Sequence, residues 1–237
     1  MILRHLHLPG LTRYTQASAL QDKLVSALLR HKANAKDIPA PEPTIITAQF
    51  RPVYTCGRRE VGTISPQQVD YLTSETILGR ASFHEALRGG QTTFHGPGQL
   101  IAYPILDLRR HAISPRCYIH MLEASVMATC AQYGVRAMRT ENPGVWVSEQ
   151  DKICAVGVHL RRNVSSHGIG LNVSTDLRWF GRIVACGLEG KGTTNLREMG
   201  VEPVPAVDEV AMVFAKQFAT HLQGIDEIKQ VNEADVN

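Results

Sequence analysis

The chain has 237 residues, of which 43% are hydrophobic, 20% charged and 6% aromatic, and its formal net charge is +3 with the histidines neutral. A chain of this length buries a sizeable core, whereas its weak charge and few aromatic residues argue against a nucleic-acid-binding protein. Five cysteines without a C-x-x-C pair argue against a disulfide framework and a structural zinc site, and favour a reducing compartment. No apolar run approaches the roughly 20 residues that span a bilayer.

Apolar residues at helical spacing predict helices over 14–32 and 208–222. Two further helices are expected after Ser65-Pro66 and Ser114-Pro115, because serine caps a helix and proline fits its first turn. Runs of β-branched and apolar residues predict strands, with a hairpin between 144–147 and 152–160. The predicted strands are 44–50, 81–87, 99–108, 144–147, 152–160 and 168–174.

This order of elements predicts an α/β (α+β) fold, with a large mixed sheet flanked by helices in a single domain. We expect the domain to cover residues 1–224 and to be followed by a polar C-terminal tail over 225–237. Because the tail offers few apolar residues, we expect it to be disordered.

The stretch "RGGQTTFHGPGQ" (88–99) surrounds Arg88 and His95 with four glycines and a proline. It fits neither the dinucleotide fingerprint nor the phosphate-binding loop pattern, so it gives little support to nucleotide binding. The glycines suit either a tight turn or a loop whose backbone lies close to an elongated, uncharged ligand. His95 is interpreted as a ring on a stiff, exposed turn, either as a hydrogen-bonded polar group or as a functional one.

Cys186 follows an apolar run and precedes Gly187, whereas Cys130 and Cys154 have the pattern of core residues. Free backbone N–H groups at such a corner can stabilise a thiolate, so Cys186 is either a nucleophile or another small core residue. Lys152 is either a solvated charge or an ammonium that lowers the pKa of a nearby thiol. His167, in "SSHGIG", is interpreted as a solvated residue of another turn.

Taken together, "RGGQTTFHGPGQ", "DKICAVGVHLRRNVSSHGIGLNVSTDL" and "IVACGL" resemble the signature blocks of the octanoyl (lipoyl) transferases. The resemblance implies the fold that these enzymes share with biotin and lipoate protein ligases. It also implies that Cys186 carries the acyl group as a thioester and that Lys152 lowers the pKa of its thiol. The acyl-binding positions would then be Arg88, Gly89, Gly90, Gln91, Thr92, Thr93, Phe94 and His95, followed by Ala155, Val156, Gly157, Gly168, Ile169 and Gly170.

The resemblance further implies transfer of an octanoyl group from octanoyl-acyl carrier protein to a lysine on the lipoyl domains of 2-oxo acid dehydrogenase complexes and on the glycine cleavage H protein. Neither a cofactor nor a metal is expected, and neither nucleic acid nor a membrane span. The location implied is mitochondrial, or cytoplasmic if the chain is bacterial. Ala185 stands where the family usually has proline. Two alternatives remain, an ATP-dependent lipoate or biotin ligase and a non-catalytic acyl-binding protein.

Overall fold

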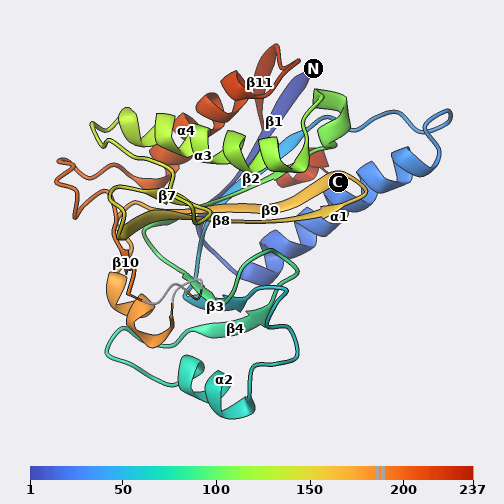
Figure 1. Ribbon diagram of the computed structural model, residues 1–237. Coiled ribbons are helices and arrows are strands. Elements are labelled where there is room, and N and C mark those ends of the chain that lie inside the picture. The colour runs from blue at the N-terminus through green and yellow to red at the C-terminus, as the bar shows by residue number, and fades with distance from the viewer. Residues whose placement is uncertain (185–186, 188–189, 237) are drawn as a thin grey trace.

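A computed structural model describes residues 1–184, 187 and 190–236. Its main feature is a twisted mixed sheet in the order β10–β8–β9–β6–β2–β1–β11, with β7 also paired to β8 (Figure 1). The pairs β1–β2, β1–β11 and β8–β10 are parallel and the other pairs are antiparallel. The strands are β1 (Ile2–Thr12), β2 (Thr44–Phe50), β6 (Gln99–Ile105), β7 (Val145–Trp146), β8 (Asp151–Arg161), β9 (Val164–Asn172), β10 (Gly192–Thr193) and β11 (Glu227–Val231).

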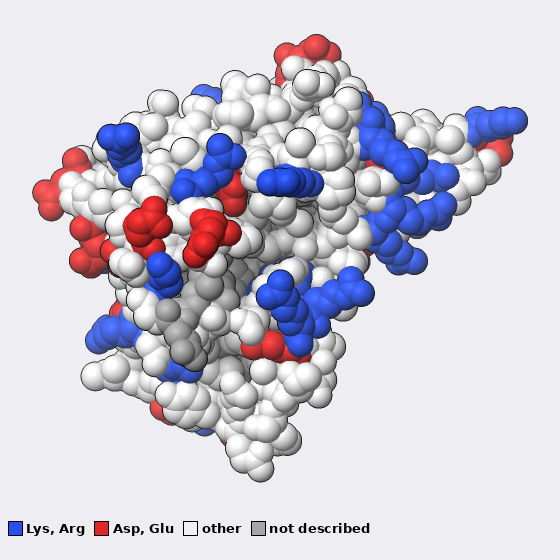
Figure 2. All heavy atoms as spheres, viewed as in Figure 1, with Lys and Arg blue, Asp and Glu red and all other residues white. Residues whose placement is uncertain are grey.

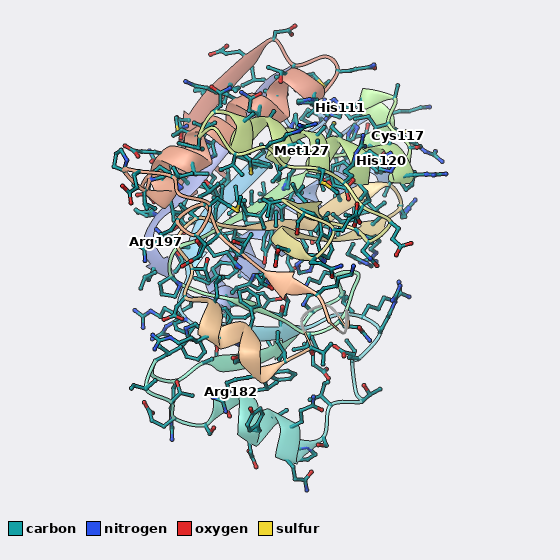
Figure 3. All side chains as sticks on the ribbon, turned by 60° about the vertical axis from the view of Figure 1, so that its left-hand side comes forward. His111, Cys117, His120, Met127, Arg182 and Arg197 are labelled. Atoms are coloured by element: carbon teal, nitrogen blue, oxygen red, sulfur yellow. The ribbon has the colours of Figure 1, made fainter. Side chains whose placement is uncertain are left out.

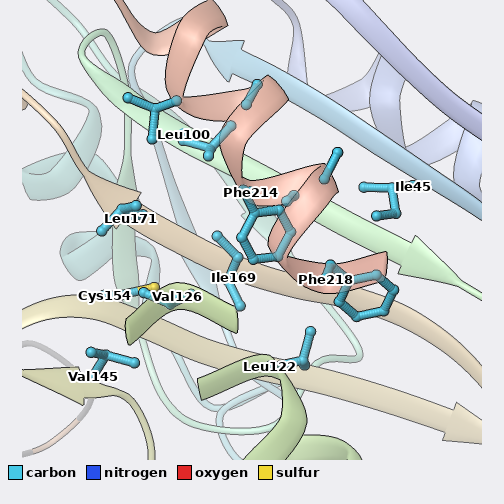
Figure 4. Packing of buried hydrophobic residues seen from close by; sticks show 14 of the residues in the cluster. Ile45, Leu100, Leu122, Val126, Val145, Cys154, Ile169, Leu171, Phe214 and Phe218 are labelled. Carbon is cyan, nitrogen blue, oxygen red and sulfur yellow. The ribbon is translucent and has the colours of Figure 1, made fainter. Parts of the chain in front are cut away.

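Helices cover both faces of this sheet. One face carries α3 (Pro115–Ala131) and α4 (Val207–His221), whose apolar sides form a buried cluster with the sheet (Figure 4). Phe214 and Phe218 stack with ring centroids 6.0 Å apart in that cluster. The other face carries α1 (Tyr14–Ala33), which packs over β2, β6 and β9. The predicted mixed α/β architecture is thereby confirmed.

A smaller sheet lies beside the large one and holds the glycine-rich stretch. Its order is β4 (Ser82–Glu85), β3 (Val53–Cys56) and β5 (Thr93–His95), with α2 (Pro66–Thr73) next to it (Figure 1). The ring of Phe94 in β5 stacks on that of Trp179, with the ring centroids 4.9 Å apart. Trp179 belongs to the 3-10 helix Leu177–Arg182. Arg182, labelled in Figure 3, lies 4.4 Å from the ring of Tyr71 and so joins that 3-10 helix to α2.

Local signals in the sequence located the helix starts correctly. The hydroxyls of Ser65 and Ser114 accept from the backbone N–H groups three residues on, both at 3.2 Å. The helices expected over 14–32 and 208–222 are α1 and α4, and the strand expected over 44–50 is β2. The hairpin between β7 and β8 is also present. Within the described part of the chain, we find no helix that combines the length and the apolar character needed to cross a membrane.

The expectation of a disordered tail after Gly224 is wrong for most of the tail. Residues Glu227–Val231 form β11, which pairs in parallel with β1 at the edge of the sheet. Gln230 donates a hydrogen bond to Nδ1 of His5 at 2.8 Å, and Nε2 of His5 lies 2.7 Å from the hydroxyl of Thr47 in β2. Since the amide nitrogen can only donate, Nδ1 of His5 is the acceptor and Nε2 carries the proton. The polar tail is therefore joined to two strands of the core.

Candidate active site

A cavity of about 410 Å³ lies where the glycine-rich stretch meets β8 and β9. Its volume is within the usual range of small-molecule sites. Twelve of the predicted site residues line it, namely Arg88, Gly89, Gly90, Thr93, His95, Lys152, Ala155, Val156, Gly157, Gly168, Ile169 and Gly170. These residues are up to 82 positions apart in the sequence. The antiparallel pairing of β8 with β9 places Ala155–Gly157 opposite 168–170.

Arg88 fixes the shape of the glycine-rich stretch from inside. Its side chain is only 8% exposed, and its guanidinium donates to the carbonyl oxygen of Thr55 at 2.6 Å and to the hydroxyl of Thr55 at 2.8 Å. It also donates to the carbonyl oxygens of Gly89 and Gln91, each at 3.0 Å. One planar cation thus ties the loop to β3, which a flexible lysine would do less well.

Two glycines of the central strands are required by close contacts across the cavity wall. A β-carbon at Gly157 would lie 3.0 Å from the carbonyl oxygen of Gly89, and one at Gly168 would lie 2.2 Å from the carbonyl oxygen of Ala102. Any side chain at Gly168 would collide with β6, and one at Gly157 would fill space between β8 and the loop. The glycines in "AVGV" and "HGIG" therefore let two backbone segments approach each other.

The two histidines at the cavity differ from the sequence-based expectation. His95 was expected on an exposed turn, but it lies in β5 and is 6% exposed. Burial, followed by the nearby Arg88, lowers the pKa of His95 to about 3 although its hydrogen bond with Gln99 opposes this. The ring is therefore neutral at pH 7.

The tautomer of His95 follows from its neighbours. Nδ1 of His95 lies 2.7 Å from Oε1 of Gln99, whose amide nitrogen donates to Oδ1 of Asn172 at 2.8 Å. The side-chain nitrogen of Asn172 in turn donates to the carbonyl oxygen of Thr194 at 3.0 Å. Because the amide nitrogen of Asn172 donates to Thr194, its oxygen faces Gln99, and because the amide nitrogen of Gln99 donates to that oxygen, the oxygen of Gln99 faces His95. An amide oxygen only accepts, so Nδ1 of His95 carries the proton and Nε2 keeps its lone pair.

His167, expected to be a solvated turn residue, also lies in the cavity wall. It is 6% exposed, has a positive φ of 56°, and its backbone N–H donates to Oε1 of Gln21 in α1 at 2.6 Å. Its ring meets that of Tyr103 edge to face at 5.4 Å, and Nδ1 finds no hydrogen-bond partner among the residues that the structure describes. Burial, followed by Arg88, lowers its pKa to about 3. The expectation of solvation was wrong because β9 is covered by α1.

Lys152 lies at the cavity with its ammonium held by the segment before β7. Nζ donates to the carbonyl oxygen of Pro143 at 3.1 Å and lies 4.7 Å from the ring centroid of Trp146. The side chain is 8% exposed, so Lys152 is not a solvated surface charge. A desolvated ammonium lowers the pKa of any thiol within about 4–6 Å.

Three predicted acyl-binding residues do not line the cavity. Phe94 points into the small core beside Trp179, and the hydroxyl of Thr92 donates to Glu60 at 2.7 Å. Gln91 packs with its side-chain oxygen 1.3 Å from where a β-carbon of Gly187 would be. The side chains of these three residues make contacts outside the cavity lining. Cys186 and Ala185 lie outside the described residues.

The sequence analysis missed other cavity residues because no local pattern distinguishes them. They are Arg59, Tyr103, Ile119, Asn142, Pro143, Val158 and His167. Tyr103 and Ile119 have the periodicity of ordinary strand and helix positions. In the described ranges, no group of three or more His, Cys, Asp or Glu side chains is placed to hold a metal ion.

The fold, a mixed sheet with helices on both faces, is that of the lipoate-protein ligases. A structure of lipoate-protein ligase A bound with ATP superimposes with a TM-score of 0.69 at 12% identity, covering 100% of this chain and 92% of that one. Protein Ta0514 of T. acidophilum with bound lipoic acid gives 0.69 at 15% identity, with 100% and 93% covered. At these identities the likeness shows the fold.

The sequence model described as the lipoyl protein ligase A/B catalytic domain matches residues 13–219, and the chain belongs to this family. A Schizosaccharomyces pombe protein named "Probable octanoyltransferase" is 50% identical over 192 residues, 81% of this chain and 83% of its own length. The mitochondrial octanoyl-acyl-carrier-protein:protein N-octanoyltransferase LIPT2 of Danio rerio is 38% identical over 212 residues, with 88% and 89% covered. The resemblance seen in the sequence motifs is confirmed.

Proposed function

We propose that this chain is an acyltransferase that moves an octanoyl group from octanoyl-acyl carrier protein to the ε-amine of a lysine on lipoyl domains. The cavity lined by the glycine-rich stretch, by the β8–β9 glycines and by Lys152 is the observation that supports this most directly. The names of the relatives support the donor and the protein acceptor.

The cavity walls suit a hydrocarbon chain. They consist largely of backbone and small or apolar side chains at Gly89, Gly90, Ala155, Val156 and Gly157. Each buried methylene contributes about 0.8 kcal/mol, so burial of the hydrocarbon alone contributes several kcal/mol to holding an octanoyl chain. Both cavity histidines have pKa values lowered to about 3, so neither adds a charge next to the chain at neutral pH.

In the proposed reaction, the thiolate of Cys186 attacks the thioester carbonyl of octanoyl-acyl carrier protein. A new thioester forms on Cys186, and the carrier leaves as its thiolate, which takes up a proton. The neutral amine of the acceptor lysine then attacks the enzyme thioester, an amide forms as the amine gives up one proton to solvent, and the Cys186 thiolate is released; this proton balances the one taken up by the carrier. Lys152 stabilises the thiolate in both halves of the cycle. Neither half consumes ATP, because amide formation from a thioester is downhill.

The acceptors in this proposal are the lipoyl domains of 2-oxo acid dehydrogenase complexes and the glycine cleavage H protein. The location proposed is mitochondrial, since several relatives have mitochondrial in their names. Lys and Arg side chains gather on the right-hand side of the face in Figure 2, while acidic ones lie mostly on its left. An acidic carrier would be steered by such a surface, so the transfer rate should fall as salt is raised.

The deciding experiment is to trap the acyl-enzyme. The protein is incubated with octanoyl-acyl carrier protein alone, and the intact mass is measured. We expect a single octanoyl adduct, labile to hydroxylamine, on Cys186. Cys154→Ser is the matched control, because Cys154 is fully buried and should not carry the adduct. Loss of the adduct in Cys186→Ser but not in Cys154→Ser supports the proposal, and normal transfer by Cys186→Ser contradicts it.

The alternatives differ in what they need. An ATP-dependent ligase acts on free octanoate with ATP and does not depend on Cys186. A non-catalytic acyl-binding protein binds octanoyl groups stoichiometrically and forms no covalent adduct. Incubation of a lipoyl domain with octanoyl-acyl carrier protein or with free octanoate, each with and without ATP, separates the three functions. We expect transfer only from the carrier thioester, with no effect of ATP.

A further inference from the structure

Glu123 is an unusual residue for its position in α3. Its side chain is 4% exposed and lies on the helix face that packs against the sheet, near Leu122 and Val126. A buried carboxylate costs several kcal/mol unless it is well hydrogen-bonded. No ion pair of Glu123 occurs among the described residues within 4.0 Å. The N–H of Gly144 donates to Oε1 of Glu123 at 3.1 Å.

That N–H belongs to the same peptide unit that holds Lys152. The carbonyl of the Pro143–Gly144 peptide accepts from Nζ of Lys152 at 3.1 Å, while its N–H donates to Glu123. A single planar amide therefore connects the buried carboxylate to the ammonium in the cavity. An N–H donated to a carboxylate polarises the amide and strengthens the hydrogen bond that its carbonyl accepts.

The rest of the segment leaves this peptide unit little freedom. Gly144 has a φ of 125°, and a β-carbon there would lie 2.8 Å from the carbonyl oxygen of Cys154 and 3.2 Å from Cε of Lys152. The indole N–H of Trp146 donates to the carbonyl oxygen of Asn142 at 3.2 Å, and the Trp146 ring lies 4.7 Å from Nζ of Lys152. The backbone of Trp146 is in turn hydrogen-bonded to Met138. Among the described residues, Glu123 is the side chain that accepts from the N–H of this peptide unit, and Lys152 is the side chain that donates to its carbonyl.

We propose that Glu123 is a positioning residue for Lys152, acting through the hydrogen bond that fixes the Pro143–Gly144 peptide. The carboxylate sets where the Pro143 carbonyl lies, and that carbonyl sets where the ammonium lies in the cavity. This inference rests on the proposed function for its effect on transfer, but the placement of Lys152 can be measured independently. A displacement of a reacting group by about 1 Å can cost about 100-fold in rate.

Three substitutions at position 123 separate a hydrogen bond from a charge and from packing. Glu123→Gln keeps an oxygen acceptor at the same reach without the charge. Glu123→Asp keeps the charge, but it is one methylene too short for the 3.1 Å contact. Glu123→Leu keeps the bulk and removes the acceptor. The proposal predicts that kcat falls in the order Glu, Gln, Asp, Leu, with KM for the carrier little changed. A role of the charge alone would place Asp above Gln.

The second readout is the chemical reactivity of Lys152, which does not depend on transferase activity. Trace acetylation with acetic anhydride, quantified on the Lys152 peptide by mass spectrometry, reports how well the ammonium is held. We expect at least about threefold faster labelling in Glu123→Asp and Glu123→Leu, and a rate near wild type in Glu123→Gln. Labelling of exposed Lys216 serves as the internal standard.

Ser125→Ala is the matched control, because Ser125 is also buried in α3 and its hydroxyl donates to the carbonyl oxygen of Met121 in the same helix at 2.8 Å. It should change neither kcat nor Lys152 labelling. The proposal is overturned if Asp retains at least as much activity as Gln, or if Lys152 labelling is the same in all three variants. Should the wild type form no acyl adduct, the proposed function fails, while the labelling series still decides the role of Glu123. Should Glu123→Leu not fold, the comparison of Gln with Asp decides alone.

Discussion

The guanidinium of Arg88 donates to both oxygens of Thr55, at 2.6 Å to the carbonyl oxygen and at 2.8 and 3.3 Å to the hydroxyl. Thr55 belongs to β3 and Arg88 follows β4, so these contacts join the glycine-rich stretch to the small sheet. The same guanidinium also donates hydrogen bonds to the carbonyl oxygens of Gly89 and Gln91. Arg88 therefore lines the cavity and also holds the glycine-rich loop that forms part of its wall.

Arg88→Lys should destabilise the protein and reduce transfer. A lysine cannot satisfy the four oxygens that the guanidinium serves, and each buried acceptor left unpaired costs roughly 1–3 kcal/mol. We expect the free energy of unfolding, measured in urea, to fall by at least about 1–3 kcal/mol, the cost of one unpaired acceptor. Arg59→Lys is the control, because Arg59 lines the same cavity but is exposed. Equal stability of Arg88→Lys and wild type would show that the loop is held by other contacts.

Gly157→Ala should reduce transfer of long acyl chains. The added β-carbon would lie 3.0 Å from the Gly89 carbonyl oxygen and 3.3 Å from Cδ of Arg88. Overpacking of this kind costs roughly 1–3 kcal/mol, so kcat/KM for octanoyl transfer should fall about tenfold or more. Gly181→Ala is the matched control, since no atom of the described residues lies within 4 Å of a β-carbon there. Kinetics with octanoyl- and hexanoyl-carrier measure the effect, and a normal octanoyl rate would place the acyl chain elsewhere.

Lys152→Ala should move the reaction of Cys186 with iodoacetamide to higher pH. Without the ammonium a nearby thiolate is less favoured, and the thiolate is the reactive form. The profile is measured in a Cys117→Ser background, because Cys117 on the outer side of α3 is exposed (Figure 3). Lys216→Ala, on α4, is the control. An unchanged profile would remove Lys152 from the activation of the cysteine.

Stability should fall as the pH drops below about 6.5. Burial, followed by the nearby His7, lowers the pKa of His5 to about 4, and burial lowers the pKa values of His95 and His167 to about 3. Between these values and 6.5 the unfolded chain binds protons that the folded one does not, so stability rises with pH and is lost on acidification. Each histidine contributes up to about 1.4 kcal/mol per pH unit.

The contribution of one histidine can be isolated with His5→Gln. Urea unfolding at pH 7, 6 and 5 should give a shallower dependence on pH for this variant than for the wild type. The substitution also weakens the link between β11 and β1, so stability at pH 7 should fall as well. A slope equal to that of the wild type would mean that His5 binds its proton in the folded state too.

Removal of residues 225–237 should lower the free energy of unfolding, whereas removal of a disordered tail would leave it unchanged. The strand β11 pairs with β1 over five register positions, and Val231 is buried. At about 0.5–1.5 kcal/mol for each net hydrogen bond, the loss should be roughly 2 kcal/mol or more. Thermal unfolding of the 1–224 chain tests this. A melting temperature equal to that of the full chain would support the domain boundary predicted at Gly224.

The sequence predicted best what depends on neighbouring residues. The serine caps of α2 and α3 lie three residues from their donors, and the strand over 44–50 is marked by its own β-branched run. It also located most of the cavity wall, because three short motifs that contain these glycines resemble blocks of the octanoyl transferases. These features need no knowledge of what packs against them.

What the sequence did not predict depends on contacts across the sheet. His95 was expected to be exposed because its flanking glycines suggest a turn, yet β5 is covered by its neighbours. The strand β11 was missed because an edge strand of mixed polarity resembles a solvated tail. Glu123 was missed because a glutamate within a helix usually faces water, and only the fold brings it to Gly144.

One eleven-residue strand, β8, carries both Lys152 and the Ala155–Gly157 wall of the cavity. A change in the twist or register of that strand moves the cation and the hydrocarbon slot as one unit. Under the proposed function, a change in β8 therefore alters the preferred acyl length and the reactivity of the cysteine together. Independent adjustment has to come from the surrounding segments, the loop that contains Arg88 on one side and the peptide beside Glu123 on the other.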